Sequence, residues 1–270
     1  MGEKFIGYVK TGASVLLFVI ACGGAWKIYD SFSSISKRSK NQDYDYEQVY
    51  KVSVGKYEPN LSQEVSQALE DRKKRSRRGA NSARFQGLSL APDLGTQRLI
   101  LRSIEEKDTE DFIETLSDYE TVYMLTFMPW PFERNRIMDY LENLSWGMAR
   151  GNAIYWAVAL PGKDQFIGVI GLTLEHEHDR AELHFWLSKK YRGKGYMTEA
   201  AKRVIHYVFT ELGVNRLDVN HLNINHASQR VIAKCGFRLE CEKEAFAKKN
   251  GKYEDMRFYR ILRREYVQAQ

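Results

Sequence analysis

A basic, glycine-rich turn connects a predicted strand to a predicted helix in the second half of the chain. The turn consists of Tyr191-Arg192-Gly193-Lys194-Gly195. Residues 181–187 before it alternate between apolar and polar, as in a strand, and apolar residues after it recur at helical spacing up to Leu212. A strand that turns through glycine into a helix points free backbone N–H groups and the helix dipole at one spot. The sequence therefore predicts a site for phosphate, to which Arg192 and Lys194 add charge.

Two side chains on the strand before this turn could accept a proton. Glu182 and His184 are two residues apart, so they face the same side of a strand. A carboxylate can act as a general base through a water molecule, and an imidazole with an ordinary pKa near about 6.5 suits the same role. Alternatively, Glu182 pairs with a lysine or arginine, and His184 is a packing histidine. The sequence leaves both interpretations open.

A further group of ionisable residues, Glu175-His176-Glu177-His178, has the side chains of a metal site. Zinc needs such ligands to converge on one point. Alternation of these residues within a short turn instead favours a solvated hairpin tip. We expect no metal ion there.

The glycine turn resembles the pyrophosphate-binding motif of the GNAT acyltransferases, Q/R-x-x-G-x-G/A, with Arg192 and Gly195 on its fixed positions. Met197 stands where most members carry Gly or Ala, which is similar to the RimJ/RimL-type branch. The resemblance extends over about Gln97 to Tyr266. Four other segments carry it in order: Thr96–Arg102, Asn225–Ser228, Lys234–Phe237 and Gly251–Asp255.

This resemblance implies an α/β fold, the GNAT acyl-CoA N-acyltransferase fold, with a mixed, mostly antiparallel sheet flanked by helices. It also implies acetyl-CoA as co-substrate and transfer of acetyl to a primary amine, either a protein N-terminus or a small amine. In the family, two splayed strands expose backbone groups to pantetheine and the thioester. The implied acetyl-CoA-binding residues are Leu183, Phe185, Trp186, Leu187, Arg192, Gly193, Lys194, Gly195, Tyr196, Met197, Asn225 and Ser228.

The catalytic residues that the resemblance implies are Glu182, Asn225 and Ser228. Glu182 matches a recurrent glutamate and would take the proton of the amine. Many members protonate the leaving thiolate with a tyrosine seven residues after the asparagine, but Ile232 stands there, so Ser228 would be the donor. Asn225 would hold the pantetheine arm or the local backbone. Ser228 could instead cap the following helix.

The missing tyrosine, and His184 where relatives usually have Gly, leave room for two other functions. One is a non-catalytic GNAT-like accessory subunit of a membrane complex, and the other is a sensor that binds acyl-CoA without turnover. Residues 96–270 are predicted to form the GNAT acetyltransferase-like domain. Its strands are predicted at 98–102, 155–160, 166–172, 216–220 and 256–262, with Asp108 capping a helix. The segment Met128–Phe132 either lines the acceptor pocket, as in the family, or packs on the core.

The net charge of +6 at pH 7 comes from the N-terminal part of the chain. Residues 1–84 hold 15 Lys and Arg against 9 Asp and Glu, so the remaining residues hold 26 of each and are neutral. A neutral domain argues against a nucleic-acid partner. Three cysteines form no disulfide framework, and a reducing compartment fits them best.

The first 30 residues are predicted to form a transmembrane anchor. Residues 11–26 carry no charge, and snorkelling of Lys10 and Lys27 would extend the useful span to residues 5–28. The alternatives are a cleaved signal segment and a buried or partner-docked helix. More basic residues follow the run than precede it. This predicts a single-pass membrane protein whose C-terminal domain lies on the cytosolic or mitochondrial matrix side.

Residues 31–95 are predicted to be a polar, basic stalk and linker with one short helix at 61–78. Leu61, Val65, Ala68 and Leu69 form its apolar stripe. The basic run at residues 72–78 is a solvated helix end or a contact with anionic lipid. Residues 31–84 could also bind partners in a membrane complex, with the bacterial and the mitochondrial inner membrane both possible.

Overall fold

The computed structural model describes residues 60–76, 87–126 and 128–268. All of them belong to one compact unit, Tyr50–Gln270. The predicted anchor at residues 1–30 and most of the predicted stalk lie outside the described residues. Within the described part of the chain, no helix is both long and apolar enough to cross a membrane.

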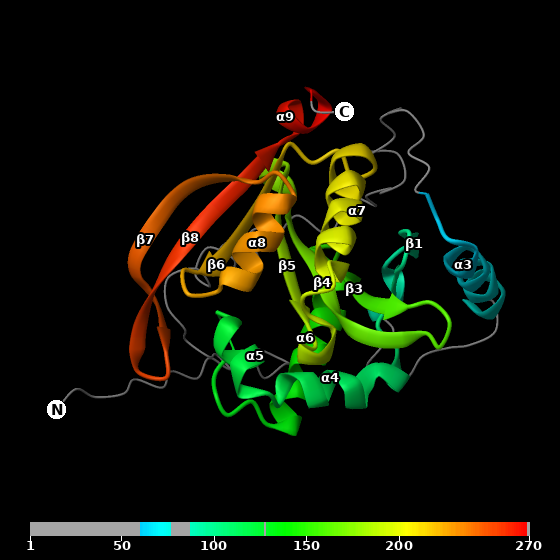
Figure 1. The fold of residues 1–270 in the computed structure, drawn as a ribbon, viewed down its shortest axis with the longest axis horizontal. Helices are drawn as coiled ribbons and strands as arrows, with labels where there is room; N and C mark the ends of the chain where they lie inside the picture. The colour runs from blue at the N-terminus through cyan, green and yellow to red at the C-terminus, as the bar shows by residue number, and fades with distance from the viewer. Residues whose placement is uncertain (1–59, 77–86, 127, 269–270) are drawn as a thin grey trace, which may run out of the picture. The chain divides into compact units, whose positions relative to one another are not determined.

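The centre of the fold is one eight-stranded sheet with the order β1-β2-β3-β4-β5-β6-β8-β7 (Figure 1). All neighbouring strands are antiparallel except β5 and β6, which are parallel. This confirms the predicted mixed, mostly antiparallel sheet. The strands are β1 (Leu94–Gly95), β2 (Ile100–Arg102), β3 (Ala153–Leu160), β4 (Gln165–Glu175), β5 (Arg180–Leu187), β6 (Arg216–Leu222), β7 (Arg238–Lys249) and β8 (Lys252–Leu262).

Helices cover both faces of this sheet. Trp156 of β3 packs edge-on against Tyr207 of α7, with ring centroids 5.6 Å apart. On the opposite face, Trp186 of β5 packs edge-on against Phe112 of α4 at 4.9 Å. The α-helices are α3 (Gln63–Ser76), α4 (Thr109–Leu116), α5 (Tyr119–Met124), α6 (Arg134–Ala149), α7 (Tyr196–Thr210), α8 (His226–Lys234) and α9 (Arg263–Gln268). In Figure 1, α7 and α8 cross the same face of the sheet.

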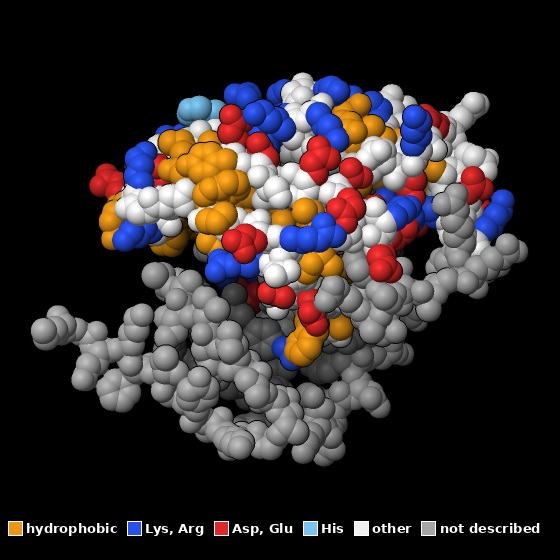
Figure 2. Space-filling model, turned by 90° about the horizontal axis from the view of Figure 1, so that it is seen from below, with side chains coloured by type: hydrophobic (Ala, Val, Ile, Leu, Met, Phe, Trp, Pro, Cys, Tyr) orange, Lys and Arg blue, Asp and Glu red, His pale blue; other side chains and the backbone are white. Residues whose placement is uncertain are grey.

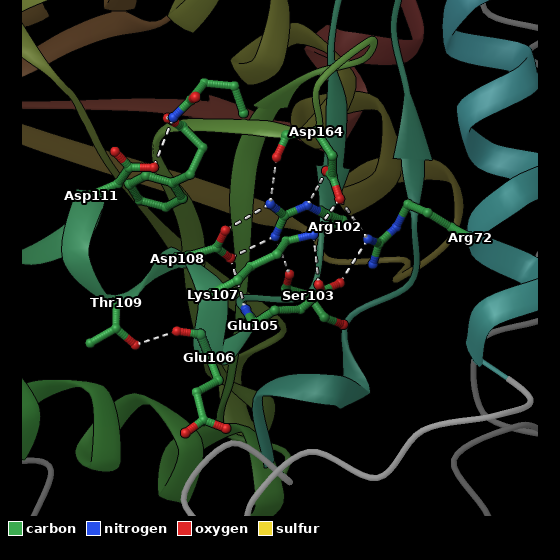
Figure 3. Close-up of polar contacts among 12 residues, drawn as sticks. Arg72, Arg102, Ser103, Glu105, Glu106, Lys107, Asp108, Thr109, Asp111 and Asp164 are labelled. Atoms are coloured by element: carbon green, nitrogen blue, oxygen red, sulfur yellow. Dashed lines mark hydrogen bonds and ion pairs between the residues drawn. The ribbon is translucent and has the colours of Figure 1, made fainter.

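A buried arginine ties the first strands to α4 (Figure 3). The side chain of Arg102 is 0% exposed and donates to both carboxylate oxygens of Asp108 at 2.6 and 2.8 Å. Its Nε donates to Asp164, in the turn between β3 and β4, at 2.6 Å. Asp108 does stand at the N-cap of α4, but its carboxylate accepts from Arg102 and from the N–H of Glu105 and makes no hydrogen bond to α4. Asp108 thus has the predicted N-cap position, but its side chain does not make the hydrogen bond to the helix that a cap provides.

The helix α3 docks on the same part of the domain. Its apolar stripe closes over β1: atoms of Leu61, Val65 and Leu69 surround the place that a side chain at Gly95 would occupy. Arg72 donates to Asp93 at 2.9 Å and to Glu105 at 2.7 Å. Arg72 thus belongs to the internal ion network. Its predicted place in a solvated or lipid-facing run is wrong.

Replacing Arg102 tests this network. Arg102→Ala leaves the buried carboxylate of Asp108 without its partner, so the free energy of unfolding should fall by about 3–5 kcal/mol in urea denaturation. Arg134→Ala breaks an exposed ion pair with Glu110 and should leave stability unchanged. Equal effects of the two substitutions would contradict the assigned role of Arg102.

Candidate active site

The parallel strands β5 and β6 part from each other soon after they begin. They pair through only three partners, Arg180↔Arg216, Ala181↔Leu217 and Glu182↔Asp218. β5 then runs on to Leu187, and β6 to Leu222. Beyond Glu182, no described strand pairs with β5 on this side, so its backbone N–H and C=O groups lack strand partners there. An extended ligand can use such groups as a strand would. We call this opening the fork.

A short 3-10 helix, Lys189–Tyr191, joins β5 to the glycine-rich turn, which ends at the N-terminus of α7. Gly193 and Gly195 have φ of +78° and +80°, a region that other residues rarely adopt. Gly195 is the N-cap and supplies no side chain to the first turn of α7. The N-terminus of α7 and its dipole thus lie at the turn where the sequence predicts an anion site, and that site stays a prediction.

A short segment before β2 holds the first turn of α7 in place. Glu199 accepts hydrogen bonds from Thr96 Oγ1 at 2.6 Å and from the N–H of Arg98 at 2.7 Å. Arg98 Nε donates to the second Glu199 oxygen at 2.7 Å, and its Nη1 donates to the carbonyl of Lys194 at 3.1 Å. We call residues 96–98 the strap. They explain why the strand predicted from Arg98 begins only at Ile100.

The two basic side chains of the turn have different environments. Arg192 donates from Nε to the carbonyl of Leu187 at 3.0 Å and from Nη2 to Thr121 at 2.6 Å. Its guanidinium therefore braces the turn against α5. Lys194 is exposed, and its Nζ lies 5.6 Å from the ring centroid of Tyr191. Of the two, Lys194 is the one whose side chain has no hydrogen-bond partner among the described residues.

Glu182 and His184 lie together at the mouth of the fork, on the α4 face of β5. Their predicted shared orientation is confirmed, because they lie two residues apart in the regularly paired strand β5. Burial lowers the pKa of His184, and the nearby Glu182 carboxylate opposes this shift. Glu182 accepts a hydrogen bond from Asn220 of β6, and the Nε2 of His184 is hydrogen-bonded to the hydroxyl of Thr173. Burial and the charge of Glu182 raise the pKa of Tyr155 to about 12. The site thus combines a fixed carboxylate with an imidazole that is neutral at pH 7.

The other arm of the fork leads into α8. Asn225 is the N-cap of this helix, and its side chain accepts from the N–H of Ser228 at 3.0 Å. Asn225 therefore holds the local backbone, and the alternative that Ser228 provides the cap is wrong. The Ser228 hydroxyl makes no hydrogen bond within the described residues. Ile232, at the position of the family's tyrosine, is buried in the core.

The loop at residues 128–132 packs partly on the core, as one of its two predicted roles requires, and its role in lining an acceptor pocket stays a prediction. Met128 and Phe132 are buried, whereas Trp130 is 37% exposed. The Phe132 ring lies 6.3 Å from that of Tyr140 on α6. Burial raises the pKa of Tyr140, and the neighbouring phenol of Tyr155 adds to this shift. A line of aromatic side chains thus runs from the loop to Tyr155, whose own pKa responds to Glu182.

The space-filling view of Figure 2 looks at the molecule from the side of α4 and α5. Hydrophobic side chains gather on this face into a patch with charged side chains at its border. Tyr119 and Trp130 are exposed, with ring centroids 5.2 Å apart, and Tyr119 lies 5.6 Å from Tyr123. These three rings form an aromatic group on the outside of the domain.

The group Glu175–His178 forms the end of β4 and a short 3-10 turn before β5. His176 is hydrogen-bonded to the carbonyl of Gly151, and Glu175 pairs with Arg180. Among the described residues, no group of three or more His, Cys, Asp or Glu side chains could hold a metal ion.

Three partners in this site were not predicted from the sequence. Glu199 carries the only local signal, as an acidic residue in the first turn of a helix. Asn220 and Thr173 come from strands on either side of β5, and their contacts depend on strand register.

Comparison with known proteins identifies a domain family. The family described as the acetyltransferase (GNAT) domain matches residues 98–238, more than half of the 270-residue chain. An uncharacterised N-acetyltransferase of Bacillus licheniformis, p20, is 27% identical over 175 residues, 64% of this chain and 98% of that protein. The ribosomal protein uS5-alanine N-acetyltransferase of Escherichia coli is 26% identical over 164 residues, 57% of this chain and 80% of that protein.

A solved structure shares the fold. Spermidine N-acetyltransferase from Vibrio cholerae, in complex with CoA and spermine, is 20% identical, with a TM-score of 0.56. The similarity covers 63% of this chain and 98% of that one.

Proposed function

The chain belongs to the GNAT acetyltransferase family and is an N-acetyltransferase, and we propose that it transfers acetyl from acetyl-CoA to a primary amine at the fork. The observation that carries this proposal is that the part of β5 without a strand partner on the β6 side is followed, a few residues later, by the glycine turn at the start of α7. The backbone of β5 beyond Glu182 suits the pantetheine arm, and the turn at residues 193–197 suits the pyrophosphate.

The reaction needs a neutral amine, a donor for the oxyanion and a proton for the leaving thiolate. In the proposal, the amine attacks the thioester carbonyl, and a new C–N bond replaces the C–S bond. Free N–H groups of β5 stabilise the oxyanion. Glu182 takes the proton of the amine through water, and the unengaged hydroxyl of Ser228 protonates the thiolate. His184 is the second candidate for the base, because its imidazole is neutral.

Two acceptor classes have support from relatives. One relative is named for an alanine of ribosomal protein uS5, and one protein of the same fold is named for spermidine. We propose a primary amine of one of these two kinds, a protein N-terminus or a small polyamine. The aromatic line from Phe132 to Tyr155 fits an acceptor that reaches the fork by a narrow, extended chain.

We also propose that residues 5–28 anchor the chain in a membrane, with the catalytic domain on the cytosolic or mitochondrial matrix side. The support is the uncharged run between Lys10 and Lys27, together with the need for an intracellular acetyl donor. A chain with these features could also serve as an accessory subunit of a membrane complex, with residues 31–84 as the contact. The apolar run together with the long polar segment at residues 31–84 favours this second function.

Anchoring is tested by fractionation. The full chain should stay in the membrane pellet after an alkaline carbonate wash, and a chain that begins at residue 60 should be released. Release of the full chain would overturn the proposed anchor and leave the enzyme proposal standing.

Donor binding is tested by calorimetry on the full chain. We expect acetyl-CoA to bind with micromolar affinity, about −8 kcal/mol. Gly195→Glu should abolish binding, because it puts a carboxylate at the anion site and a side chain at a positive φ. Gly251→Glu has the same backbone strain at the β7–β8 turn and should bind normally. Normal binding by Gly195→Glu would refute the assigned site.

The base is tested by kinetics with matched variants. Glu182→Gln should lower kcat by about 10²–10⁴-fold without changing acetyl-CoA affinity, whereas the exposed control Glu177→Gln should have no effect. If His184 is the base, activity falls as pH drops below about 6.5 through its lowered pKa, and His184→Gln lowers kcat and removes this pH dependence. Unchanged kcat in both variants would exclude both residues.

A further inference from the structure

A lysine is buried where the β7–β8 hairpin meets α5. Lys249 is the last residue of β7 and is 4% exposed. Its Nζ donates to three carbonyl oxygens, those of Val122 at 3.2 Å, Leu125 at 2.7 Å and Met128 at 2.5 Å. An ammonium group has three N–H donors, so all of them are used. None of its described partners is a carboxylate.

These carbonyls belong to the end of α5 and the turn that follows it. α5 has only six residues and ends at Met124, so it depends on outside contacts for its stability. A cation at a helix C-terminus satisfies free carbonyls and opposes the negative end of the dipole. Burial lowers the pKa of Lys249 to about 8, because removal from water disfavours the charged form of the amine.

A second contact joins the same two elements. The hydroxyl of Tyr123 on α5 donates to Glu254 of β8 at 2.7 Å. Glu254 is buried and also pairs with Lys252 at 2.8 Å. The hairpin end is thus fixed to α5 at two points, although α5 and the hairpin are more than 120 residues apart in the sequence.

The turn that Lys249 holds leads directly into the loop at residues 128–132. Met128 is itself one of the three carbonyl partners. At the other end of the loop, Phe132 contacts Tyr140, which neighbours Tyr155 at the fork. The position of Lys249 therefore sets where the loop begins. In the proposed function, this loop lines the way of the acceptor to Glu182.

We propose that Lys249 is a positioning residue for the amine acceptor: it fixes the start of the 128–132 loop so that the wall of the acceptor path keeps its shape. This rests on the proposed function. Lys249 touches neither the fork nor the glycine turn, so its loss weakens acceptor binding and leaves acetyl-CoA binding intact.

The experiment compares Lys249→Met with Lys248→Met in the full chain. Methionine fills a similar volume without charge or donors. Lys248 is the exposed neighbour, whose Nζ lies 5.3 Å from the Tyr253 ring centroid, so it controls for loss of a lysine at this hairpin. The readouts are acetyl-CoA affinity by calorimetry and the KM and kcat for two probes, spermidine and a short peptide with an N-terminal alanine. The rate of amide hydrogen exchange at residues 122–132 measures the stability of the turn and needs no acceptor.

We expect Lys249→Met to raise the acceptor KM about tenfold, with kcat and acetyl-CoA affinity within about twofold, and to speed exchange at residues 122–132. Lys249→Arg keeps the charge and should recover part of the KM, which provides the test if Lys249→Met does not fold. An acceptor KM equal to that of Lys248→Met, or a parallel loss of acetyl-CoA affinity, would overturn the inference. A wild-type chain that acetylates neither probe would instead overturn the proposed function, and the acceptor role with it.

Discussion

The parting of β5 from β6 is the constraint on which the rest of the site depends. Backbone N–H and C=O groups inside a sheet need partners, and strands that separate after three paired residues leave such groups free in the middle of the sheet. A ligand with its own amide groups can satisfy them. Because the two strands are parallel, α7 and α8 both begin at the same end of the sheet, beyond the open side of the fork. Their N-termini and the free strand backbone therefore converge on one place.

The surrounding contacts keep this opening in shape. The strap holds the first turn of α7 through Glu199, Arg192 braces the glycine turn against α5, and Lys249 holds the end of α5. Farther away, Arg102 fixes α4, which packs on Trp186 beside His184. The links through Glu199, Arg192 and Lys249 join residues at least 71 positions apart, whereas Arg102 and Asp108 are six apart.

Local patterns predicted most of the fold. Alternation located β3, β4, β6 and β8, and the period of two placed Glu182 and His184 on one face. β7 was not predicted as a strand. Its residues are exposed on both faces, and its many charged residues leave no regular alternation of apolar and polar side chains. The partners of the site were missed for a different reason. Asn220, Glu199 and Lys249 are ordinary polar residues in sequence, and their roles appear only when register and packing bring them to distant partners.

A crystal structure of the chain with CoA tests the central claim most directly. The account predicts the pantetheine arm between β5 and β6, hydrogen-bonded to the backbone of residues 183–187, with the pyrophosphate at the N–H groups of residues 193–197. CoA bound elsewhere on the molecule, with the fork filled by protein side chains, would contradict it.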